Sequence, residues 1–170
     1  SGALVLNNKI SDLIPKVSGG GQEFGLRGGT ENLLGIISFG ECASVIKEMA
    51  DERNRIKELI KLLEDNLSSL GANIFGYNVK RLPNTSLFSF EDFKAESLLM
   101  RLDLAGFSVS SGSACSSGKV KVSHVLKAMN ISESMQKGAI RVSLGWGSSK
   151  EQVESFISFF ENIFNKKVKE

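Results

Sequence analysis

Residues 85–104 read TSLFSFEDFKAESLLMRLDL, a strand-like segment followed at once by a helix-like one. Hydroxyl, aromatic and aliphatic residues predict a strand over Thr85–Phe90, and apolar residues at helical spacing predict a helix over Ala95–Leu104. Further strands are predicted at Ala72–Gly76 and Phe107–Ser110. The connection between the strands at 72–76 and 85–90 is too short for a helical crossover, which favours antiparallel pairing there.

Outward from this stretch, strand and helix signals continue to both ends of the chain. We expect strands over residues 1–6 and Ala139–Leu144. We expect one helix from Thr30, as N-cap, to Met49 and a second from about Ile56 to a stop at Gly71, with a break between them near Ala50 and Asp51. Two further helices are expected over His124–Met129 and Ser149–Phe164. This alternation predicts an α/β fold with a mixed, partly antiparallel sheet packed with helices.

Composition narrows the class of protein. The 170 residues include 21 basic and 19 acidic side chains, for a net charge of +2, so no nucleic-acid or membrane partner is expected. No stretch approaches the roughly 20 apolar residues of a membrane span, and we expect a soluble protein. Two cysteines are too few for a disulfide framework or a zinc ribbon, which favours a reducing, cytoplasmic compartment and no metal site.

Cys115 is the strongest candidate for chemistry. It lies in a loop of small polar residues, 111–118, that provides no bulky side chains to bury it. Lys119 and Lys121 follow closely and would favour the thiolate form, so we interpret Cys115 as a reactive thiol on a mobile loop. Cys42, on the apolar face of a predicted helix, is expected to be a core residue instead.

One segment and two further residues are weaker candidates for a functional site. The glycine-rich segment 19–29 leads to Thr30 and a helix start, which could bind an anion but could equally be a flexible linker. Arg141, among apolar residues of a predicted strand, needs an anionic partner, either an internal carboxylate or a bound one. His124, the single histidine, is expected to cap its helix or to pack as a ring.

Five motifs follow one another along the chain. They are GGGQE at 19–23, LRGGTEN at 26–32, RLPNT at 81–85, SSGSACSSG at 110–118 with SHVL at 123–126, and IRVSLG at 140–145. In this order they resemble the motifs of the pyridoxal-phosphate-dependent cysteine desulfurases, and the resemblance covers essentially the whole chain. The loop with Ser111 before Gly-Ser-Ala-Cys is similar to the NifS/IscS-like branch.

The resemblance implies a role for three residues. Cys115 would attack the sulfur of cofactor-bound L-cysteine, become a persulfide and later pass the sulfur to an acceptor such as an iron–sulfur cluster scaffold. Arg141 would hold the substrate carboxylate. Thr30 would contact the phosphate of the pyridoxal phosphate in the neighbouring subunit, which implies a homodimer. Gly29 stands where many relatives carry Ser.

The resemblance also implies which part of a larger enzyme this chain represents. The Schiff-base lysine of the family lies before the strand that matches residues 3–6, and Lys9 does not match its position. We therefore expect the C-terminal portion of a fold-type I enzyme, inactive by itself. Residues 1–48 would be the end of the large cofactor domain, and residues 49–170 the small α/β domain that carries the cysteine loop.

Two alternatives remain open. One is another class V aminotransferase or a selenocysteine lyase, neither of which needs a thiol on a glycine- and serine-rich loop. The other is a thiol or sulfur-carrier module that uses Cys115 without pyridoxal phosphate.

Overall fold

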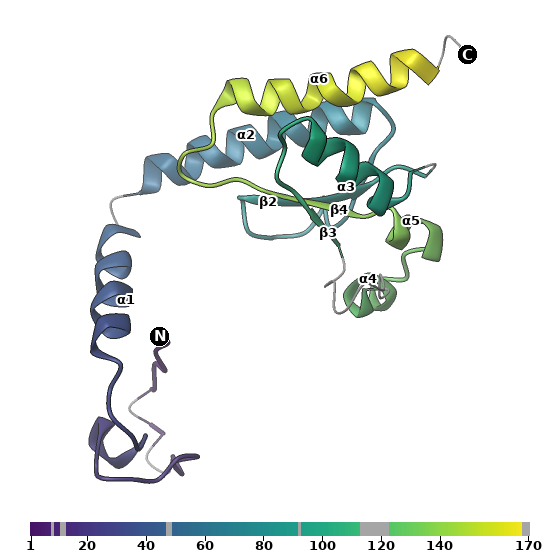
Figure 1. Cartoon of the computed structure of the whole chain (residues 1–170). Coiled ribbons are helices and arrows are strands. Elements are labelled where there is room, and N and C mark those ends of the chain that lie inside the picture. The colour runs from purple at the N-terminus through teal and green to yellow at the C-terminus, as the bar shows by residue number, and fades with distance from the viewer. Residues whose placement is uncertain (8, 11–12, 47–48, 92, 113–122, 168–170) are drawn as a thin grey trace. The chain divides into compact units, whose positions relative to one another are not determined.

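The computed structural model describes residues 1–167 except 8, 11–12, 47–48, 92 and 113–122. The chain divides into two compact units, Ser1–Ala50 (unit 1) and Asp51–Glu170 (unit 2), drawn in Figure 1. The sequence predicted a boundary between residues 48 and 49. The assignment of the two parts to a large and a small domain stays a prediction.

Unit 1 contains a 3-10 turn, η1 (Glu23–Gly25), and one α-helix, α1 (Leu33–Ile46). The predicted strand over residues 1–6 is wrong, because this segment is irregular and mostly exposed. A strand needs a neighbour for its backbone groups, and the described part of unit 1 provides none. The Asn32 Oδ1 atom accepts a hydrogen bond from the Gly35 N–H at 3.2 Å, so Asn32 caps α1 in place of Thr30.

The long helix α2 (Ala50–Ser69) lies in unit 2 except for its first residue. It is a separate helix from α1, as predicted, but the break precedes Ala50 and does not follow it. The helix ends where the sequence predicted. Gly71 adopts a φ of +90°, and the Ala72 N–H donates to the Leu67 carbonyl at 2.9 Å. This left-handed closure satisfies a terminal carbonyl and favours glycine at its turn.

A four-stranded sheet forms the centre of unit 2, with strand order β1-β2-β4-β3. The strands are β1 (Asn73–Ile74), β2 (Thr85–Ser89), β3 (Ser110–Ser111) and β4 (Ile140–Ser143). All three pairings are antiparallel, so the α/β class is confirmed but the expected mixed pairing is not found. The helix α3 (Ala95–Leu104) does join two strands that run in the same direction, β2 and β3. However, β4 lies between them and is antiparallel to both.

One face of the sheet packs against α2, α3 and α6 (Lys150–Lys167) in a single core. Phe88 in β2 is completely buried and meets the rings of Phe90 and Phe160 edge-on, at centroid distances of 5.9 and 5.8 Å. The apolar face predicted for the C-terminal helix therefore lies in the core, with Val153, Phe156, Ile157 and Phe160 buried and Phe164 packed against them.

Two short helices, α4 (His124–Ala128) and α5 (Glu133–Lys137), supply a smaller cluster that includes Leu87. Leu87 pairs with Arg141, and Phe88 with Ile140, so Leu87 and the core residue Phe88 lie on opposite faces of the sheet. The helix α5 has no counterpart in the sequence prediction. Its Ser132 hydroxyl accepts from the Met135 N–H at 3.5 Å, which is its local start signal.

Arg55 of α2 holds the loop between β4 and α6. Its guanidinium donates to the Trp146 carbonyl at 2.7 Å and to the Ser148 carbonyl at 2.6 Å, while it also pairs with Glu52 at 2.8 Å. The loop backbone is thereby fixed to α2, whereas the indole of Trp146 remains exposed.

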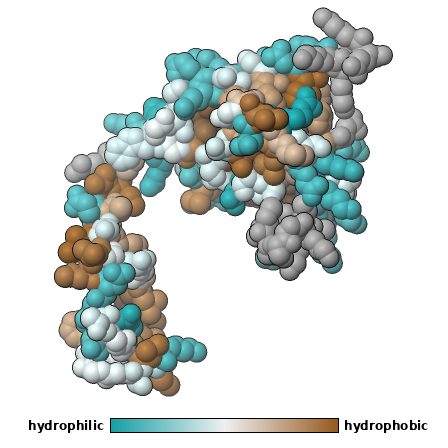
Figure 2. Space-filling model, in the orientation of Figure 1, coloured by the Kyte–Doolittle hydropathy of each residue, from teal (hydrophilic) through white to brown (hydrophobic). Residues whose placement is uncertain are grey.

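Apolar side chains reach the surface of unit 1, where Figure 2 shows brown atoms in one view. In α1 no residue is buried, and Leu34 is 80% exposed. Within the described helices, none combines the length and the apolarity needed to cross a bilayer.

Candidate functional site

The cysteine loop joins an edge strand to a helix. Cys115, Lys119 and Lys121 lie outside the described residues, but both flanks of the loop are described. The Gly112 N–H donates to the Ala139 carbonyl at 2.9 Å, and a Cβ on Gly112 would lie 2.8 Å from the Ala139 Cβ. On the other flank, the Ser123 hydroxyl accepts from the Leu126 N–H at 3.4 Å and caps α4. Both flanks are therefore anchored in unit 2.

Arg141 lies in β4, directly opposite Ser110 of the edge strand β3. Its Nη2 donates to the Ser110 hydroxyl at 3.4 Å, a long contact that leaves the guanidinium exposed. Burial alternates along β4, with Ile140 and Val142 buried and Arg141 and Ser143 exposed. Among the described residues Arg141 has no carboxylate partner, so its fork remains available for a bound anion.

Arg141 and the start of the cysteine loop lie on neighbouring strands, β4 and the edge strand β3. Ser110, the hydrogen-bond partner of Arg141, precedes Cys115 by five residues in the sequence. Ser110 belongs to one of the sequence motifs, but the sequence predicts no role for it. Its hydrogen bond with Arg141 joins residues 31 positions apart, and only the register of the sheet reveals it.

Thr30 ends the glycine-rich segment of unit 1 and is exposed. In this segment the backbones approach closely. The Gly28 N–H donates to the Val17 carbonyl at 2.7 Å, and a Cβ on Gly28 would lie 2.6 Å from the Ser18 carbonyl. Arg27 donates to the carbonyls of Gly29 and Thr30 at 2.9 and 3.1 Å. The segment therefore folds back on itself, with residues 17–19 against Gly28.

Two sequence expectations about reactive side chains are wrong. Cys42 is exposed and not a core residue, because none of the elements described in unit 1 covers its helix. His124 neither caps α4 nor packs as a ring, because Ser123 provides the cap and the His124 side chain is exposed.

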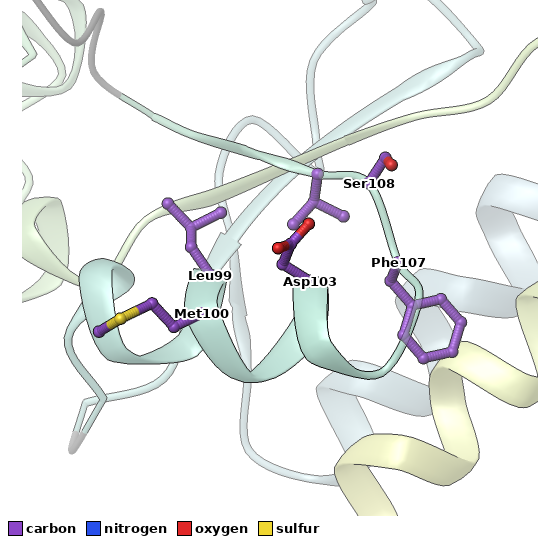
Figure 3. A pocket seen from close by; sticks show the side chains of 6 residues that line it. Leu99, Met100, Asp103, Phe107 and Ser108 are labelled. Atoms are coloured by element: carbon purple, nitrogen blue, oxygen red, sulfur yellow. The ribbon is translucent and has the colours of Figure 1, made fainter.

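A shallow cavity of about 410 Å³ lies between α3 and the segment 107–109, upstream of β3. Figure 3 shows Leu99 and Asp103 directed from α3 toward this segment. Of the described site residues, neither Thr30 nor Arg141 is among those that line the cavity.

The comparisons with known proteins support one family. The aminotransferase class-V family model matches residues 9–156. A cysteine desulfurase IscS of Dictyoglomus turgidum is 40% identical over 97% of this chain, and a cysteine desulfurase of Gluconacetobacter diazotrophicus is 38% identical over 97%. The chain spans 42% of the length of each of these two relatives.

Solved structures agree with this match. A NifS-like protein from Rickettsia africae superposes with a TM-score of 0.77 at 36% identity, over 91% of this chain and 41% of that one. A second NifS-like protein gives a TM-score of 0.74 at 33% identity, over 89% of this chain and 38% of that one. Since the family model covers most of the residues, the chain belongs to the aminotransferase class-V family and is similar to its NifS/IscS-type cysteine desulfurases.

Proposed function

We propose that this chain is part of a longer pyridoxal-phosphate-dependent cysteine desulfurase. The reaction takes L-cysteine and the Cys115 thiol to L-alanine and a persulfide on Cys115. The observation that carries the proposal is the exposed Arg141 guanidinium, which contacts Ser110 at the edge strand that leads into the cysteine loop. A carboxylate-binding arginine beside a thiol loop fits an amino acid whose sulfur is removed.

The residues of this chain have separate tasks in that reaction. Arg141 binds the substrate carboxylate in a bidentate fork and orients the side chain toward the loop. The Cys115 thiolate, favoured by Lys119 and Lys121, then attacks the substrate sulfur. A sulfur–sulfur bond forms as the carbon–sulfur bond breaks. The electron pair stays with carbon, which takes up a proton and leaves as alanine.

The described residues fit a peripheral contribution to the cofactor site. Thr30 is exposed at the end of the glycine-rich segment, and its hydroxyl could donate a hydrogen bond to a phosphate oxygen. In our proposal Thr30 serves the phosphate of the neighbouring subunit in a homodimer, and the Schiff-base lysine belongs to the rest of the longer protein. Bound pyridoxal phosphate would supply an electron sink for the substrate.

Persulfide sulfur must leave for the next turnover. A loop of small residues between two anchored flanks can carry Cys115 from the substrate to an acceptor. We propose a protein acceptor, such as an iron–sulfur cluster scaffold, in a reducing cytoplasmic compartment that preserves free thiols.

The test compares the two cysteines of the chain in the longer protein. Cys115→Ala should lower alanine formation from cysteine by about a hundredfold or more, since it removes the nucleophile, while the visible absorbance of bound cofactor persists. Cys42→Ala is the matched control and should keep the wild-type rate, because the Cys42 side chain is exposed and far from this chemistry in the sequence.

Alanine formation at the wild-type rate by Cys115→Ala would contradict the nucleophile assignment. A Cys115→Ala enzyme that still releases alanine from selenocysteine but not from cysteine would favour a selenocysteine lyase. Absence of bound cofactor in the longer protein would favour a sulfur-carrier module.

A further inference from the structure

An ion pair between the buried carboxylate of Glu64 and the half-buried guanidinium of Arg81 joins α2 to the segment before β2. The Glu64 side chain on α2 is 3% exposed, and its Oε2 accepts from the Arg81 Nη2 at 2.5 Å. The Arg81 Nη1 donates to the Thr85 carbonyl at 2.8 Å. A single guanidinium thus connects a helix of the core to the first residue of the strand β2.

Glu64 depends on Arg81 for its charge balance. Its second oxygen, Oε1, is buried without a hydrogen-bond partner among the described residues. A buried carboxylate deprived of its partner is strongly unfavourable, whereas a buried pair replaced as a whole by apolar side chains often costs little. The pair is therefore a poor source of stability, but it fixes the position of the segment before β2 relative to α2.

The segment held by Arg81 also holds the end of β4. The Leu144 N–H donates to the Asn84 carbonyl at 2.8 Å, and the Asn84 side chain reaches the Leu144 carbonyl at 3.4 Å. The hydroxyls of Thr85 and Ser143 lie 3.4 Å apart across the two strands. Arg81 thus holds Thr85, the chain neighbour of Thr85 is Asn84, and Asn84 holds Leu144, three residues from Arg141.

We propose that Glu64 and Arg81 are positioning residues for Arg141. In the ladder between β2 and β4, Leu87 opposes Arg141, and a one-residue slip would turn Arg141 toward the α2 and α6 side of the sheet. By fixing Thr85 and Asn84 to α2, the pair fixes this register and the direction of the Arg141 guanidinium. The inference rests on the proposed function, because it assigns Arg141 the substrate carboxylate.

A double variant separates positioning from stability. Glu64→Met with Arg81→Met removes both charges together and leaves no unpaired buried carboxylate. In the longer protein, this variant should raise the KM for cysteine by about tenfold, the effect of losing one well-placed hydrogen bond to a charged group, with kcat changed much less. Arg81→Lys keeps the charge but not the fork, so it should give an intermediate KM.

The matched control is another ion pair of the same unit. Glu133 and Lys137 on α5 pair at 2.6 Å on the exposed surface. Glu133→Met with Lys137→Met should leave KM unchanged. An equal rise in KM for this control, or a wild-type KM for the Glu64 and Arg81 double variant, would overturn the proposal.

A second readout does not depend on activity. Hydrogen exchange at the Leu144 amide should become at least tenfold faster in the double variant and in Arg81→Lys, while exchange in α3 stays unchanged. Unchanged protection of the Leu144 amide from exchange in both variants would overturn the proposal that Glu64 and Arg81 fix β4. If the wild-type protein releases no alanine from cysteine, the proposed function fails, and exchange at Leu144 still decides whether the pair fixes β4.

Discussion

Leu34 in unit 1 is 80% exposed, whereas Phe88 in unit 2 is completely buried, although both belong to strongly apolar segments. The helix α1 is apolar nearly all round, with Glu41 as its single charged residue, and buries none of its side chains. The helix α2 alternates charged and apolar residues and buries a stripe against the sheet. Apolar content therefore does not by itself produce a core; a helix needs a contrasting face and neighbouring elements to cover it.

Truncation of one apolar side chain in each unit should have very different effects on stability. Phe88→Ala should lower the free energy of unfolding of unit 2 by about 3–5 kcal/mol, because it removes a ring that packs on Phe90 and Phe160. Leu34→Ala should change stability by less than about 0.5 kcal/mol, as is usual for an exposed side chain. Denaturant unfolding of the 170-residue chain measures both.

Equal losses from the two truncations would show that α1 is buried in solution. The same two variants should also be measured in the longer protein. A loss of about 2 kcal/mol or more from Leu34→Ala there would mean that the remaining polypeptide covers α1.

Replacing one glycine in each unit with alanine should also affect the two units differently, with smaller changes in stability. A Cβ on Gly138 would lie 2.5 Å from the Phe93 carbonyl oxygen, so Gly138→Ala should destabilise unit 2 by about 1–3 kcal/mol. A Cβ on Gly40, inside α1, would meet nothing within 4 Å. Gly40→Ala should therefore stabilise α1 by about 1 kcal/mol, the difference in helix propensity. Thermal unfolding followed by circular dichroism measures whether each variant is stabilised or destabilised. Destabilisation by Gly40→Ala would mean that other side chains pack against α1.

The smallest effect concerns charge on the surface of unit 2. The hydrogen bond from Lys137 holds the pKa of Glu133 below its ordinary value. A carboxyl with a lowered pKa stabilises the folded state above its unfolded pKa, and this stability is lost as the pH falls through the folded pKa. Glu133→Gln should lower the Tm slightly near neutral pH and not at all in strong acid.

A Tm difference for Glu133→Gln that persists in acid would contradict the charge-based explanation. A large difference at neutral pH would weaken the contrast between the units, because unit 2 would then depend on surface charge as well as on its core.

Much of unit 2 could be predicted from the sequence. The bounds of α3 agree with the prediction, since its apolar spacing is regular and Gly106 follows it with a φ of +85°. The five-residue helix α5 was missed because it is too short to show periodicity. The strand predicted over residues 1–6 is absent because strand formation depends on a partner that the local sequence cannot reveal.

The candidate site was only partly predictable for the same reason. Arg141 and the cysteine loop are visible as sequence motifs, but the contact of Arg141 with Ser110 follows from pairing between distant strands. The link from Glu64 through Arg81 joins residues 17 positions apart in different elements. Such contacts arise from the arrangement of the sheet against α2, and no local pattern encodes them.

The loop held by Arg55 gives the chain an optical label. Trp146 is its single tryptophan, with an exposed indole on a backbone that is fixed to α2. Tryptophan emission from this chain therefore comes from one place, just beyond the strand that carries Arg141. Quenching of that emission by iodide should be efficient, and any ligand or partner that covers this end of β4 would be visible as a blue shift without an added dye.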